Sequence, residues 1–184
     1  MSTILSRTKT LKNGETLHLR NVKLLEAAEI IHFVKTVGVE TDFLTFGAGE
    51  FNKTVAEEET IISEHLAAPN RIFIAATIQG EIVGILNVTA SPKPRLQHSG
   101  EFGVSVLKKH WGKGIGRLLI ETMLEWAEHS PIIRKLNLKV LANNTTALAL
   151  YKSIGFEEEG YLKEDTFVNG VYQDAHVMAY FMGR

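Results

Sequence analysis

The sequence predicts a mixed α/β fold of the α+β kind, centred on one sheet. Strand-like and helix-like segments follow one another along the 184 residues in the order β-α-α-β-β-β-α-β-α-β-β. Two pairs of strand-like segments are joined by dipeptides typical of tight hairpin turns, Gln79-Gly80 and Asn169-Gly170. Between the two hairpins lies a clear amphipathic helix at residues 115–128. A mostly antiparallel sheet flanked by about four helices accommodates this order.

The N-terminal third is expected to contain one strand and two helices. Polar and apolar residues alternate over residues 16–20, which predicts the strand. The first helix is indicated by apolar residues at helical spacing, namely Leu24, Ala28, Ile31 and Val34. The second helix is expected to begin at Thr54, which forms a capping-box pattern with Glu57.

The rest of the chain supplies the other strands and two further helices. Residues 71–78 and 81–89 predict the first hairpin, residues 91–100 a loop with two prolines, and residues 101–106 a third strand. In the amphipathic helix the expected core positions are Ile115, Leu119, Met123 and Trp126. Residues 136–140 predict the next strand. Asn144 is expected to cap a short helix that ends at a left-handed Gly155.

Length and composition narrow the class of protein. The length and the 45% hydrophobic content suit one domain spanning residues 1–184. Lys and Arg number 20 against 21 for Asp and Glu, so we expect no nucleic acid and no membrane among the partners. The absence of cysteine excludes a disulfide framework and a cysteine nucleophile, and the scattered histidines predict no metal site. Without a signal peptide or membrane span, a cytoplasmic location is expected.

A glycine-rich segment, Gly112-Lys113-Gly114-Ile115-Gly116, stands between a strand and a helix. Backbone N–H groups at such a helix N-terminus can hold an anionic oxygen. The segment is not a dinucleotide fingerprint, because that motif needs a third glycine where Arg117 or Leu119 stands. It is not a P-loop either, because Gly114 stands where Ser or Thr is required.

A second motif follows downstream. It reads N-x-x-A-x-x-L-Y-x-x-x-G-F and consists of Asn144, Ala147, Leu150, Tyr151, Gly155 and Phe156. Together with the upstream W-G-K-G-I-G, it resembles the two signature segments of the GNAT superfamily of N-acetyltransferases. The run EFGVSVLKKHWGKGIG is similar to the branch that contains ribosomal-protein N-terminal acetyltransferases. This resemblance, tightest over residues 101–156, implies a GNAT-like fold and acetyl-CoA as the co-substrate.

The resemblance also implies which residues hold acetyl-CoA. Main-chain groups of Val104 and Val106 would pair with the pantetheine arm as an added strand does. The pyrophosphate would lie on N–H groups of the glycine loop. The residues implied for binding are Val104, Val106, Trp111, Gly112, Lys113, Gly114, Ile115, Gly116, Arg117, Asn144 and Tyr151. The Lys113 and Arg117 side chains are equally well explained as solvated residues at a helix start.

The chemistry needs a base, an oxyanion donor and an acid. An alkyl amine with a pKa of about 10.4 is mostly protonated at neutral pH, so a carboxylate must take its proton, directly or through a water. Glu101 is the candidate, although an exposed strand-end glutamate without a role is an equal alternative. The resemblance implies the N–H of Val106 as oxyanion donor and Tyr151 as general acid.

The acceptor is expected between residues 37–51, which contain Phe43, Leu44 and Phe46, and the terminal hairpin. Core packing by these aromatic residues is the alternative. We expect acetyl transfer directly to a small-molecule amine or to a peptide or protein N-terminus. Two alternatives stay open: an enzyme that uses a longer acyl-CoA, and a non-catalytic acyl-CoA-binding regulatory module. A homodimer is expected by analogy.

Overall fold

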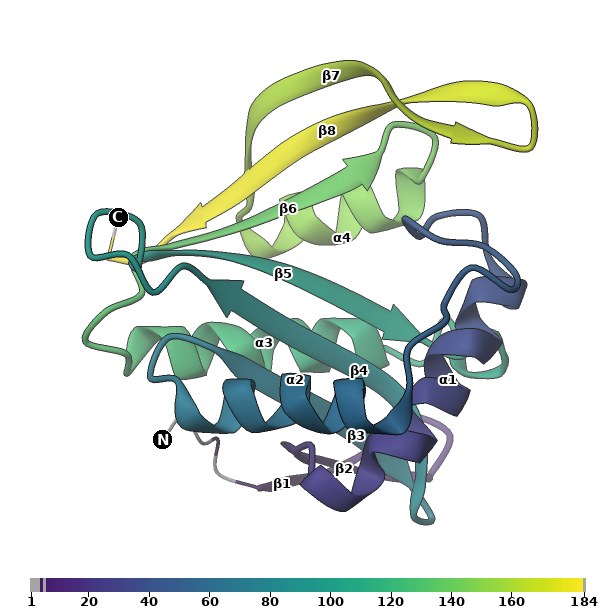
Figure 1. Cartoon of the computed structure of the whole chain (residues 1–184), viewed down its shortest axis with the longest axis vertical. Helices are drawn as coiled ribbons and strands as arrows, with labels where there is room; N and C mark the ends of the chain where they lie inside the picture. Colours follow the sequence, from purple (N-terminus) through teal and green to yellow (C-terminus); the bar gives the residue numbers. More distant parts are fainter. Residues whose placement is uncertain (1–3, 5, 184) are drawn as a thin grey trace.

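The computed structural model describes residue 4 and residues 6–183. The strands are β1 (Arg7–Thr10), β2 (Thr16–Asn21), β3 (Ile72–Ile78), β4 (Glu81–Ala90), β5 (Ser99–Val106), β6 (Lys135–Leu141), β7 (Glu157–Val168) and β8 (Val171–Phe181). The helices are α1 (Ala27–Glu40), α2 (Val55–Ala67), α3 (Ile115–Glu128) and α4 (Thr145–Ile154), with short 3-10 turns η1 (Leu24–Glu26) and η2 (Lys108–His110). The expected mixed fold with four helices is confirmed (Figure 1).

The strands form one sheet in the order β1-β2-β3-β4-β5-β6-β8-β7. Neighbouring strands are antiparallel except β5 and β6, which run parallel. Both expected hairpins are present, and their turn residues all have positive φ: 51° and 89° at Gln79 and Gly80, and 50° and 81° at Asn169 and Gly170. Positive φ at both central residues suits the right-handed twist of the flanking strands, which explains the dipeptides found there.

The expected capping residues begin and end the helices. Thr54 accepts a hydrogen bond from the backbone N–H of Glu57, and the Glu57 carboxylate accepts one from the N–H of Thr54 at 2.8 Å. The Asn144 side chain accepts from the N–H of Ala147 at 3.2 Å. Gly155 ends α4 with φ at 110°, a conformation that glycine adopts without steric cost.

The structure differs from the sequence-based expectations in three details. Ile31 and Val34 are buried in α1 as expected, but Leu24 and Ala28 are exposed. Leu24 lies in η1, before α1 begins, and Ala28 lies on α1 beside the buried stripe. The buried stripe contains Ala27, Ile30, Ile31, Phe33, Val34 and Val37. β1 was not expected, because its sequence RTKT lacks an apolar alternation. In the structure this strand is mostly exposed. β5 begins at Ser99, inside the expected loop.

The two faces of the sheet carry separate cores. Ile115, Leu119 and Met123 of α3 pack on one face together with Tyr151 of α4. Helices α1 and α2 cover the opposite face, where Ile30 and Ile62 are buried (Figure 1). Because side chains alternate along a strand, neighbouring residues of β5 belong to different faces of the sheet.

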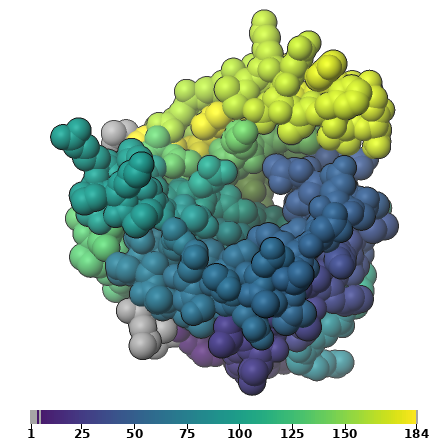
Figure 2. Space-filling view, viewed as in Figure 1, coloured from purple at the N-terminus to yellow at the C-terminus, as the bar shows by residue number. Residues whose placement is uncertain are grey.

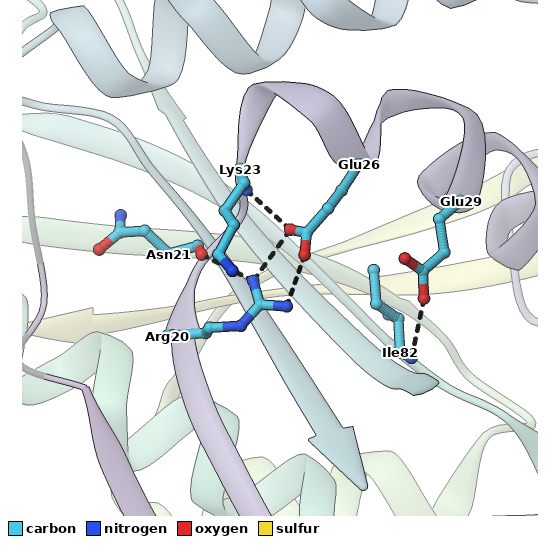
Figure 3. Close-up of polar contacts among 6 residues, drawn as sticks. All are labelled: Arg20, Asn21, Lys23, Glu26, Glu29 and Ile82. Atoms are coloured by element: carbon cyan, nitrogen blue, oxygen red, sulfur yellow. Dashed lines mark hydrogen bonds and ion pairs between the residues drawn. The ribbon is translucent and has the colours of Figure 1, made fainter. Parts of the chain in front are cut away.

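An ion pair joins β2 to the start of α1. The two guanidinium nitrogens of Arg20 donate to the two carboxylate oxygens of Glu26 at 2.9 and 2.5 Å (Figure 3). The backbone N–H of Lys23 donates to the same carboxylate at 2.8 Å. Glu29, one turn later, accepts from the N–H of Ile82 in β4 at 3.2 Å. These contacts fix the N-terminus of α1 on the sheet.

We expect Glu26→Gln to lower the free energy of unfolding by about 1–3 kcal/mol at pH 7. Burial raises the pKa of Glu26, but the hydrogen bonds from Arg20 and Lys23 outweigh burial and leave the pKa below its usual value. A carboxylate with a lowered pKa stabilises the fold above its unfolded pKa and loses this effect as the pH falls through the folded pKa.

Urea unfolding at pH 7 and at pH 3 measures this difference between wild type and variant. The exposed Glu59→Gln on α2 is the matched control and should unfold like wild type. A difference at pH 3 as large as that at pH 7 would contradict the assignment to the charged carboxylate.

Candidate active site

The sheet opens between its two parallel strands. β5 and β6 pair only from Ser99 to Glu101 and from Lys135 to Asn137. Beyond this point β5 stays paired with β4 up to Val106, while β6 stays paired with β8 up to Leu141. The two strands therefore diverge (Figure 1). Figure 2 shows the molecule hollowed here, between the blue segment that joins α1 to α2 and the teal and green strands.

The edge of β5 along this opening presents backbone groups of Val104 and Val106. The N–H of Leu107 donates to the carbonyl of Val83 in β4 at 3.0 Å. Because N–H groups alternate in direction along a strand, those of Val104 and Val106 point away from β4 and into the opening. The indole N–H of Trp111 donates to the carbonyl of Val106 at 2.7 Å, as this direction requires.

The glycine loop lies at the open end, directly after β5 and η2. Gly112 and Gly114 have φ values of 74° and 82°, which favour glycine. The N–H of Leu118 makes the first hydrogen bond of α3, to the carbonyl of Gly114 at 3.1 Å. The N–H groups of the three residues before it, Ile115, Gly116 and Arg117, have no acceptor within the helix. Together with the helix dipole they suit an anion.

The two charged side chains of the loop have protein partners. The ammonium of Lys113 donates to the carboxylate of Glu15 in the β1–β2 turn at 2.8 Å. The guanidinium of Arg117 donates to the hydroxyl of Ser153 on α4 at 2.5 Å. The main chain and the helix dipole are therefore the groups of this loop directly available to an anion.

Two glycines of the loop are expected to respond differently to alanine. A Cβ at Gly114 would have open space, yet Gly114→Ala should lower the free energy of unfolding by about 1–2 kcal/mol because of its positive φ. Gly116 lies within α3, and its Cβ would meet Leu150 at an ordinary 4.0 Å. Gly116→Ala should leave stability unchanged or raise it by up to about 1 kcal/mol.

Urea unfolding of both variants and of wild type makes the comparison. Equal losses of stability in the two variants would show that the loop does not impose its backbone conformation on Gly114.

Tyr151 lies on the face of the sheet that α3 and α4 cover. Its ring packs edge-on against Phe102 of β5, with centroids 6.1 Å apart, and against Phe156 at 5.6 Å. Burial raises the pKa of Tyr151 to about 12, so the phenol keeps its proton at neutral pH. It can donate a proton or a hydrogen bond but cannot serve as a base.

Glu101 lies on the opposite face, at the last paired position before the strands diverge. Its neighbour Phe102 points toward Tyr151, so the Glu101 side chain points toward the α1 and α2 side. The carboxylate is exposed and makes no hydrogen bond or ion pair with the described residues. An unpaired carboxylate at this position is available to a basic group that enters the opening.

The segment between α1 and α2 crosses the open end of the hollow. The Glu40 carboxylate accepts from the N–H of Lys108 at 2.7 Å, and Asp42 accepts from the Asn169 side chain at 3.0 Å. Leu44 and Phe46 pack against the core beneath α1 and α2, as the packing alternative expects, while Phe43 is exposed. Only part of the expected acceptor wall therefore faces outward.

Sequence reasoning missed His65 and Thr89. The His65 ring is buried beneath α2, and its Nε2 lies 3.2 Å from the hydroxyl of Thr89, which is opposite Glu101 in β4. No local pattern marks this pair, since the contact joins a helix to a strand beyond it.

Within the described part of the chain, no group of acidic and histidine side chains is arranged to hold a metal ion. Nor does any described helix have the length and apolar character needed to cross a bilayer.

The chain is similar to a family model, to solved structures and to curated proteins. The family model described as Acetyltransferase (GNAT) family matches residues 39–156. The crystal structure of a GNAT-family acetyltransferase from Streptococcus pneumoniae is similar with a TM-score of 0.88 and 32% identity, over 90% of this chain and 99% of that one.

Two curated relatives have named substrates. L-amino acid N-acetyltransferase AaaT of Escherichia coli is 33% identical over 106 residues, which are 58% of this chain and 65% of that enzyme, slightly under two thirds of its length. Spermidine N(1)-acetyltransferase of Vibrio cholerae is 27% identical over 158 residues, which are 85% of this chain and 90% of that enzyme.

Proposed function

Because the chain belongs to the acetyltransferase (GNAT) family, we propose that it transfers an acetyl group from acetyl-CoA directly to a primary amine. The observation that carries this function is the opening between β5 and β6. A glycine loop lies at its open end, and Glu101 and Tyr151 flank its closed end from opposite faces. One reactant can then be held along the strand edge while the other approaches from the α1 and α2 side.

The residues at the opening fit acetyl-CoA. Val104 offers its backbone N–H to the extended amide-containing arm, and Val106 offers its own to the thioester. The N–H groups of Ile115, Gly116 and Arg117 offer an anion site one short loop away. Asn144, which caps α4, and Trp111 are the further residues we assign to this site. When bound, acetyl-CoA supplies the activated acetyl group as a thioester.

The chain's own residues then perform the proton transfers. Glu101 takes the proton of the attacking amine, directly or through a water. The N–H of Val106, fixed in the strand, donates to the oxygen on which negative charge develops. The Tyr151 hydroxyl donates to the departing sulfur. We propose these roles together with a single acetyltransferase domain at residues 1–184, while the expected homodimer stays a prediction.

We propose a small-molecule amine or a peptide N-terminus as the acceptor. The amine-binding group we assign, Glu101, is one exposed carboxylate, which recognises an amine without selecting the rest of the molecule. The names of the two curated relatives, an amino acid and a polyamine acetyltransferase, support acceptors of this class.

The test is a thiol-release assay with the purified full chain, acetyl-CoA and a panel of spermidine, aminoglycosides, L-amino acids and short peptides. The chain has no cysteine and adds no thiol background. Acceptor-dependent release supports the proposal and gives the acceptor class. No release with any amine, while acetyl-CoA still raises the Tm, would favour a binding module instead. If acetyl-CoA does not raise the Tm either, the proposed cofactor site is wrong.

A further inference from the structure

Thr89 and Glu101 form a pair on the α1 and α2 face of the sheet. They are directly opposite in the antiparallel ladder of β4 and β5, so their side chains share one face with Cβ atoms about 4.5–5.5 Å apart. Both residues are exposed. They lie at the closed end of the opening, on the side from which the proposed function brings the amine.

His65 determines which way the Thr89 hydroxyl points. Nδ1 of His65 lies 2.7 Å from the carbonyl of Ile61, and a carbonyl can only accept, so Nδ1 carries a hydrogen. Burial lowers the pKa of His65, so the ring is neutral at neutral pH and its Nε2 carries no hydrogen. At 3.2 Å from Nε2, the Thr89 hydroxyl is therefore the donor.

The His65 ring cannot easily abandon this orientation. Its relative exposure is 4%, and it packs against the Phe73 ring with centroids 5.5 Å apart. The hydroxyl hydrogen of Thr89 therefore points toward the buried Nε2 of His65. The remaining lone pairs of the oxygen are left for a donor on the exposed side.

We infer that Thr89 is a second binding residue for the acceptor amine, with its hydroxyl oriented by His65. An amine that gives one proton to Glu101 carries further N–H groups, and the oriented Thr89 oxygen accepts from one of them. Glu101 thus removes a proton while Thr89 holds the nitrogen in place. His65 acts through Thr89 and is a positioning residue. This inference rests on the proposed function.

The first test is Thr89→Val, which keeps the β-branched shape and removes the hydroxyl. With spermidine, L-leucine or a short peptide, whichever amine the wild type acetylates, the KM for the amine should rise about fivefold, the value of one ordinary hydrogen bond. The KM for acetyl-CoA should not change. Thr89→Ser restores a hydroxyl and should return most of the affinity for the amine.

Thr8→Val is a closely matched control. The Thr8 hydroxyl also contacts a histidine ring, with 3.1 Å to Nδ1 of His18, and Thr8 also lies on a strand. It belongs to β1, at the far edge of the sheet. This variant should keep the wild-type KM for both substrates.

His65→Phe tests the positioning role separately. It leaves the Thr89 hydroxyl in place but free to rotate, so the KM for the amine should rise by less than in Thr89→Val. A His65→Phe enzyme with the wild-type KM, beside an impaired Thr89→Val enzyme, would overturn the role of His65 alone.

The outcomes separate this inference from the proposed function. If the wild type acetylates an amine and Thr89→Val keeps its KM, the inference fails while the proposed function stands. If the wild type acetylates no amine, both fail, because the site then has no amine to hold. A raised KM for the amine that Thr89→Ser reverses supports both.

Discussion

Replacing Tyr151 by phenylalanine is expected to lower kcat about a hundredfold and to leave the affinity for acetyl-CoA nearly unchanged. The ring packs against both Phe102 and Phe156, and phenylalanine keeps these contacts. Only the hydroxyl is lost. The variant should therefore fold, bind acetyl-CoA and react slowly.

The size of the effect follows from two pKa values. Burial raises the pKa of Tyr151 to about 12, whereas a thiol has a pKa of about 8.5. Transfer of the phenolic proton to the departing sulfur is therefore uphill, which makes Tyr151 a weaker general acid than an unburied tyrosine. We therefore expect a loss at the lower end of the range for acid catalysis, which is about 10²–10⁴.

Thiol release measures kcat, and calorimetric titration with acetyl-CoA measures the Kd. Tyr180→Phe is the matched control, because Tyr180 also packs against Phe156, with centroids 5.4 Å apart. An unchanged kcat in Tyr151→Phe would remove the hydroxyl from the mechanism. A large loss of affinity for acetyl-CoA would make it a binding group.

Glu101→Gln is expected to lower kcat/KM for the amine about a hundredfold at pH 7, because glutamine cannot take a proton. The difference in kcat/KM between variant and wild type should become smaller as the pH rises toward the pKa of the amine, about 10.4 for a lysine-like group. More of the amine is then unprotonated in solution and needs no base. Glu101 is exposed and unpaired within the described residues, so its replacement should not affect folding.

The measurement is kcat/KM between pH 7 and pH 9 for wild type, Glu101→Gln and the exposed control Glu128→Gln. A constant ratio of variant to wild type over this range would argue against a base. Wild-type activity in Glu101→Gln would leave Glu101 as a strand-end residue without a catalytic role.

Features encoded by neighbouring residues could be predicted from the sequence. The Gln79-Gly80 turn, the Thr54 capping box and the Gly155 cap each depend on a few consecutive residues, and all three are confirmed. Of the expected α1 stripe, Ile31 and Val34 are buried, whereas Leu24 is exposed because it lies in η1, before α1 begins. Local periodicity does not contain this information.

Features that depend on distant pairing could not be predicted from the residues alone. The divergence of β5 and β6 follows from where their ladder ends, at Glu101 and Asn137, and each strand separately looks regular. The contact of His65 with Thr89 likewise joins residues on different elements. Family resemblance indicated Glu101 and Tyr151, but it did not indicate the hydroxyl beside Glu101.

The placement of Glu101 and Tyr151 on opposite faces also has a kinetic consequence. Because β5 and β6 separate beyond Glu101, the amine and acetyl-CoA can reach the reaction centre from different faces of the sheet. Each product can then leave without passing the other. Such an enzyme can bind both substrates before it releases either product. Its steady-state rates would then follow a sequential ternary-complex scheme, without the substituted-enzyme form of a ping-pong cycle.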